Sequence, residues 1–215
     1  MLRLDDVGAA TKEYRYTVAG QLLGRREWAP YQEISAGLWR DIGALLRRLN
    51  QRIIVAVTAC WVYEPLPGRY SLIPYPERFP GPAHRLRNLA HEGVVEIANH
   101  GLAHWDGVTD PRPRWLRSNR PAWREFRQHA GEWEVTMWNR CHRRLEESQT
   151  ILGDWLGHRP AVFVPPGYDA SGFADWTDWA KYGISAVLGP APDAYHDRDV
   201  VLGGVEWLER RLSPS

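Results

Sequence analysis

Two histidines four residues apart, His100 and His104, come just after the largely apolar run 94–98. Two adjacent carboxylates, Asp5 and Asp6, end a shorter apolar run at the start of the chain. Imidazole and carboxylate groups form open catalytic zinc sites, in which three protein ligands leave one position for water. Asp6, His100 and His104 would supply such a set. The ion lowers the pKa of its water toward ~7, and Asp5 is then left over as a general base. The predicted chemistry is hydrolysis.

The spacing of the histidines does not establish a site by itself. With eight histidines in 215 residues, about a quarter of one such pair is expected by chance. The alternative is that Asp5 and Asp6 form a turn or helix N-cap, and that His100 and His104 are polar residues of a loop. The secondary structure around these residues is needed to decide between the two interpretations.

The residues that could take part in catalysis or metal binding all follow predicted strands. A third apolar run, 161–164, stops at two prolines, which close a central strand. Ligands of parallel α/β folds bind at the carboxyl ends of strands. Apolar periodicity predicts helices over about 31–50, 83–91, 132–156 and 171–182, strands over 53–57 and 184–188, and loops over 9–29 and 61–82. This alternation predicts a parallel sheet in a single α/β domain over residues 1–215.

The composition restricts the classes of protein to which this chain could belong. With 44% hydrophobic and 25% charged residues it is ordinary for a soluble globular protein, and no segment reaches the ~18 consecutive apolar residues of a membrane span. A net charge of +1 gives no reason to expect nucleic acid as a partner. The start of the chain has no basic segment followed by an apolar one, so we expect no secretory signal and a cytoplasmic location.

Three motifs together resemble those of the NodB-homology polysaccharide deacetylases, carbohydrate esterase family 4. Residues 3–8, Arg-Leu-Asp-Asp-Val-Gly, are similar to the family's Thr-Phe-Asp-Asp-Gly motif. Residues 100–104 match its His-x-x-x-His motif, and residues 164–168, Val-Pro-Pro-Gly-Tyr, resemble its Arg-Pro-Pro-Tyr-Gly type of motif. The three occur in the family's order, and in combination they are specific.

The resemblance implies an irregular (β/α) barrel of about six or seven parallel strands, with an open doubly wound sheet as the alternative fold. It implies a metal-dependent hydrolase that removes an N-acyl group, with acetyl the first choice, from an amino sugar or glycan. Asp5 is then the general base, and Asp6, His100 and His104 hold zinc or a similar divalent ion.

The sequence departs from the family at two positions. Val164 stands where the family has an arginine that contacts the base, so the sequence does not say what holds Asp5. The late Leu-x-His motif, which supplies a histidine acid, has no clear match, and His196 is the candidate in that region. The residues expected to contact substrate are Pro166, Tyr168, Trp61 and Trp105.

Two other functions remain open. The missing arginine and histidine, together with 12 tryptophans, also suit a non-catalytic carbohydrate-binding or scaffold protein on the same barrel. A hydrolase of a non-sugar amide is the other alternative, because a fold does not determine its substrate. The sequence predicts neither the identity of the metal nor the oligomeric state.

Overall fold

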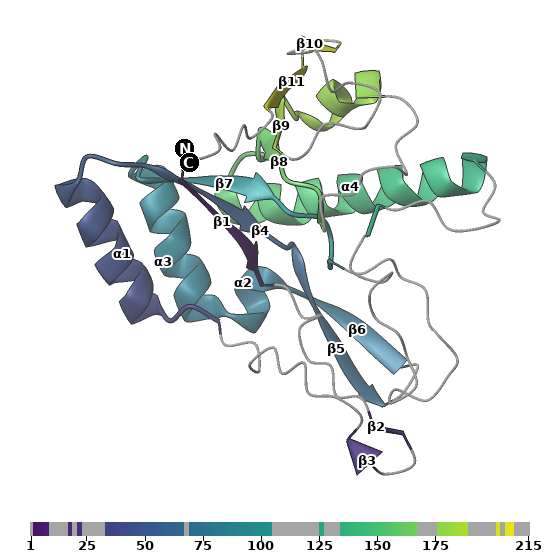
Figure 1. Ribbon diagram of the computed structural model, residues 1–215, viewed down its shortest axis with the longest axis horizontal. Helices are drawn as coiled ribbons and strands as arrows, with labels where there is room; N and C mark the ends of the chain where they lie inside the picture. Colours follow the sequence, from purple (N-terminus) through teal and green to yellow (C-terminus); the bar gives the residue numbers. More distant parts are fainter. Residues whose placement is uncertain are drawn as a thin grey trace.

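A seven-stranded sheet organises the protein (Figure 1). The computed structural model describes residues 2–8, 17–18, 21–22, 33–66, 69–104, 125–126, 134–166, 176–188, 201–202 and 205–208. The strands have the spatial order β1-β4-β7-β8-β9-β11-β10. Their bounds are β1 Leu2–Val7, β4 Ile53–Val57, β7 Val95–Asn99, β8 Val162–Phe163, β9 Ala186–Leu188, β10 Val201–Leu202 and β11 Val205–Leu208.

Six of the described strands in this sheet run parallel, and β10 pairs antiparallel with β11. The central strands are apolar almost without interruption because both faces of a parallel sheet are covered. In β4, for example, Ile54, Val55 and Val57 are all at most 5% exposed. The predicted parallel α/β sheet is therefore confirmed, with β11 as a strand that apolar patterning did not identify.

The sheet is strongly curved. Arg3 Nη1 in β1 donates a hydrogen bond to the carbonyl oxygen of Leu188 in β9 over 3.4 Å. Three strands separate β1 from β9 in the sheet, and in a flat sheet four spacings of about 4.8 Å would place them about 19 Å apart. No arginine side chain spans that distance. The curvature gives the partial barrel that the predicted barrel fold requires.

The helices form where apolar periodicity predicts them, with shifted ends. Helix α1 (Ala36–Arg48) begins at Ser35, whose Oγ accepts the Leu38 N–H over 3.1 Å as an N-cap. Helix α3 (Pro80–His91) starts earlier than predicted, because proline fits the first turn. Figure 1 shows α1 and α3 side by side and the long helix α4 (Glu134–Leu156) passing close to β7. A 3₁₀ helix, Trp176–Tyr182, replaces part of the α-helix predicted over 171–182.

The loop predicted over 61–82 is wrong. Residues Cys60–Leu66 (β5) and Arg69–Pro74 (β6) pair as an antiparallel hairpin that projects from the sheet, and Tyr75–Arg78 (α2) follows (Figure 1). The pairing register shifts between Tyr63 and Leu66, where Pro65 lies, so the hairpin tolerates this proline at an irregularity. In the predicted loop 9–29, Thr17–Val18 (β2) pairs with Gln21–Leu22 (β3). Among the described helices, none is both long and apolar enough to cross a bilayer.

Candidate active site

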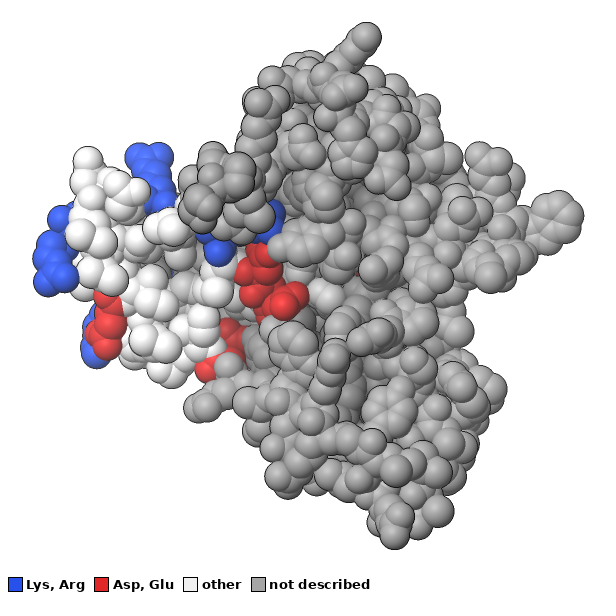
Figure 2. Space-filling view, viewed as in Figure 1, with Lys and Arg blue, Asp and Glu red and all other residues white. Residues whose placement is uncertain are grey.

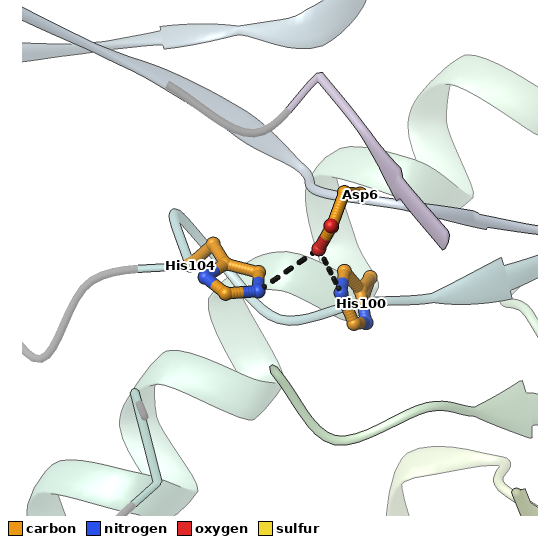
Figure 3. Close-up of side chains that lie close together, drawn as sticks. All are labelled: Asp6, His100 and His104. Atoms are coloured by element: carbon orange, nitrogen blue, oxygen red, sulfur yellow. Dashed lines mark hydrogen bonds and ion pairs between the residues drawn. The ribbon is translucent and has the colours of Figure 1, made fainter. Parts of the chain in front are cut away.

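Asp6, His100 and His104 meet at the carboxyl ends of β1 and β7 (Figure 3). Asp6 Oδ1 lies 3.1 Å from Nε2 of His100 and 3.1 Å from Nε2 of His104, and one ligand atom from each residue lies within 4.8 Å of the others. Tetrahedral zinc, with ligands about 2.0–2.2 Å away, keeps those ligands about 3.3 Å apart. The two Asp6–histidine distances are already close to this spacing, so a small adjustment of the three side chains would enclose one ion.

A bulge in β1 aims Asp6 at the two histidines. The pairing of β1 with β4 advances three residues on β1, from Leu4 to Val7, but only two on β4. Asp6 within this bulge has a φ of +64°, a left-handed conformation that aspartate tolerates better than most residues. Regular alternation would send Asp5 and Asp6 to opposite faces, whereas a bulge redirects a side chain. The sequence motif alone does not contain this information.

The ring of His100 is fixed in a form suited to metal binding. His100 is 3% exposed, and its Nδ1 lies 2.7 Å from the carbonyl oxygen of Val164, an acceptor only. Nδ1 must therefore carry the hydrogen, which leaves the Nε2 of a neutral ring with a lone pair facing Asp6 Oδ1. Two acceptors 3.1 Å apart repel each other unless a proton or a cation lies between them. A bound metal ion removes this conflict, and such an orienting carbonyl is typical of metal-ligating histidines.

The segment from Gly101 to His104 is a tight turn that begins and ends on a left-handed residue, and it is not a helical turn. Gly101 has a φ of +84° and His104 a φ of +51°. The Gly101 N–H donates to Asn99 Oδ1 over 2.7 Å, and its carbonyl accepts the Ala59 N–H over 3.0 Å. The His100 N–H donates to the carbonyl of Val57 over 2.9 Å. The turn is thus anchored to the end of β4 and the residues that follow it.

An alanine at position 101 is expected to distort this turn. An added Cβ would clash with Glu125 Oε2 and lie 2.8 Å from Pro166 Cγ. The left-handed backbone costs about 1–2 kcal/mol, and overpacking costs a further ~1–3 kcal/mol. We expect Gly101→Ala to lower both Tm and zinc affinity, measured by thermal unfolding and metal titration. Gly157→Ala is the control, because Gly157 also has a φ of +84° but nothing within 4 Å of its added Cβ. Equal effects of the two substitutions would contradict the steric argument.

The site is electrostatically suited to hold a carboxylate as an anion. Burial alone would raise the pKa of Asp6, but hydrogen bonds and charge interactions with His100 and His104 in their protonated, cationic forms outweigh this effect and hold that pKa well below its usual range. Figure 2 shows acidic side chains gathered near the centre of the view, where β1 ends in Figure 1, with basic side chains beside them. An ionised Asp6 beside two imidazoles is the donor set of a divalent metal site.

Arg3 holds the second carboxylate, Asp5. The Nε atom of Arg3 lies 2.8 Å from Asp5 Oδ1, and both side chains are largely buried, at 14% and 23% exposure. The same guanidinium also donates to the carbonyl of Leu188 on β9. Arg3 is therefore an ion-pair partner of Asp5, whereas Val164 is fully buried and apolar. Motif comparison missed Arg3, although residues i and i+2 of a strand share a face.

The structure describes two of the other predicted site residues, Pro166 and Trp61. Pro166 is buried next to Gly101 and thus packs against the histidine turn. Trp61 on β5 is partly exposed and packs edge-on against Phe79 with ring centroids 5.4 Å apart. The three remaining predictions lie outside the described residues: Trp105, Tyr168 and His196.

Comparison with known proteins shows a shared fold. No protein-family model matches the sequence, and none of the curated proteins matches it. The structure is similar to the deacetylase domain of BpsB from Bordetella bronchiseptica, with a TM-score of 0.50 and 22% identity, covering 82% of this chain and 66% of that one. It is similar to a de-N-acetylase from Aggregatibacter actinomycetemcomitans, with a TM-score of 0.50 and 17% identity, covering 82% of this chain and 65% of that one.

The chain thus spans about two thirds of the length of each of these two structures. The likeness agrees with the curved parallel sheet. The resemblance that the motifs indicated is therefore confirmed at the level of architecture: the protein has the fold of the polysaccharide deacetylases.

Proposed function

We propose that the protein is a metal-dependent hydrolase that removes an N-acyl group, with acetyl the first choice, from an amino sugar or glycan. The proposal is carried by Asp6 Oδ1, which lies 3.1 Å from Nε2 of both His100 and His104. The fold shared with a deacetylase domain and a de-N-acetylase agrees with this reaction class. Zinc is the first candidate for the ion, because two imidazoles and one carboxylate are a common zinc donor set.

The residues of the site have different roles in the proposed hydrolysis. A divalent ion bound by Asp6 and the histidines would polarise the acyl carbonyl and lower the pKa of water. Asp5, next to Asp6 in the chain, accepts the proton of the attacking water as general base. His100 cannot take this role through Nδ1, because that atom donates to Val164. The ion pair with Arg3 fixes the orientation of the Asp5 carboxylate.

Removing the charge of Arg3 is expected to reduce turnover without removing the metal. Arg3→Met keeps the unbranched stem of the side chain but loses the guanidinium and its ion pair with Asp5, and a misplaced base lowers the rate by about 10- to 100-fold. Initial rates and zinc titration measure the two quantities separately. Arg40→Met is the control, since Arg40 Nε pairs with Asp41 over 3.1 Å on the exposed surface of α1. An unchanged rate in Arg3→Met would show that Arg3 does not position the base.

Acetate release tests the proposed reaction. Purified protein loaded with zinc is incubated with chitin oligomers, nucleotide-linked amino sugars and lipid-linked sugars. We expect acetate to be released, to stop with a chelator and to resume when zinc is restored. Binding of these glycans without turnover would instead support a carbohydrate-binding scaffold. Turnover of non-sugar amides alone would show that the substrate is not a sugar.

A further inference from the structure

A buried carboxylate outside the three motifs lies beneath the histidine turn. Glu125 is 0% exposed. Its Oε1 accepts the backbone N–H of Leu102 over 3.2 Å, and its Oε2 accepts those of Ala103 over 3.2 Å and His104 over 3.1 Å. Three consecutive backbone N–H groups converging on one anion form a nest. Here the anion is a side chain of the protein itself.

These hydrogen bonds give the turn its shape. Residues 101–104 are buried and lie outside the helices and strands, so their N–H groups need other acceptors. Asn99 takes the first of them and Glu125 takes the next three. His104, with a φ of +51°, is held by the last of these bonds. Glu125 therefore determines where the second histidine of the pair stands.

Helix α4 holds Glu125 from below. Arg144 Nε lies 2.7 Å from Glu125 Oε1, and Arg140 Nη1 donates to the Glu125 carbonyl over 2.9 Å. A buried carboxylate is tolerated only when it is paired and hydrogen-bonded, and both conditions are met. One turn further along α4, Ser148 Oγ accepts a hydrogen bond from Asn99 Nδ2 over 2.8 Å. Arg140, Arg144 and Ser148 are spaced four residues apart on one face of α4. Together they fix Glu125 and Asn99, which accept the N–H groups of the turn.

We infer that Glu125, supported by Arg144, is a positioning residue of the metal centre that sets His104 Nε2 for ligation. This inference rests on the proposed metal site. Glutamine cannot replace Glu125, because both carboxylate oxygens accept hydrogen bonds and an amide has a single oxygen. In either orientation, the NH₂ group of Gln would face backbone N–H groups or Arg144. The turn would then relax and move His104 away from Asp6.

Zinc affinity and the absorption spectrum of bound Co²⁺ test the inference on the full chain. We expect Glu125→Gln to bind zinc about 10- to 100-fold more weakly, as other residues that orient ligands do, and to change the Co²⁺ ligand-field bands. Glu146→Gln is the matched control, since Glu146 pairs with Arg159 on the exposed side of α4. It should retain wild-type affinity and spectrum. Circular dichroism confirms that both variants are folded.

A second variant decides the matter if Glu125→Gln does not fold. Arg144→Lys keeps the positive charge but moves the donor away from Glu125, so we expect a smaller loss of zinc affinity and a shifted Co²⁺ spectrum. Wild-type affinity and spectrum in the folded variant would overturn the inference while leaving the proposed function intact. A wild-type protein that binds no zinc would overturn both.

Discussion

Asp6→Asn is expected to weaken zinc binding by roughly tens-fold or more and to abolish hydrolysis. Asp6 is the one anionic ligand in the candidate set, and a neutral amide oxygen is a poorer partner for a divalent ion. Asparagine also tolerates the left-handed backbone at this position, so the bulge in β1 should survive the change. Equilibrium titration with zinc measures the affinity, and acetate release measures the rate.

A matched control separates this effect from a general change of charge. Asp41→Asn removes an exposed carboxylate paired with Arg40 on α1 and should leave both quantities unchanged. Wild-type zinc affinity in Asp6→Asn, with the fold intact, would show that the ion lies elsewhere or that no such site exists.

Asp5→Asn should have the opposite profile, with zinc retained and turnover reduced by about 10² to 10⁴, the usual contribution of a positioned general base. Asp5 is paired with Arg3, whereas Asp6 faces the histidines. The same titration and rate assay decide the assignment. If Asp5→Asn loses zinc and Asp6→Asn keeps it, the two roles are reversed.

Much of the architecture could be predicted from the sequence because periodicity and strand-end motifs are local signals. The apolar run before His100 forms the predicted strand, β7, and the apolar series over 132–156 forms the predicted helix, α4. The β5–β6 hairpin was missed because its prolines are typical of loops, although β-branched and aromatic residues lie between them. The strand β11 (Val205–Leu208) was also not predicted, because a run of four residues is too short to be distinguished from a loop by its pattern.

The geometry of the candidate site was only partly predictable. The bulge that redirects Asp6 depends on how β1 pairs with β4, and no motif encodes that pairing. Arg3 could have been identified from strand alternation, since it shares a face with Asp5. Glu125 had no comparable signal, because it is 21 positions from His104 in a stretch without periodicity. Its role depends on tertiary contacts with α4.

The most direct test of the central claim is the anomalous difference map of a crystal of the full chain soaked in zinc. The metal site predicts one peak bound by Asp6 Oδ1 and by the Nε2 atoms of His100 and His104, at about 2.0–2.2 Å from each. At a zinc concentration that only partly fills the wild-type site, the same peak should be much weaker in crystals of Asp6→Asn. A zinc peak bound by other residues, or an empty position between these three side chains at saturating zinc, would contradict the claim.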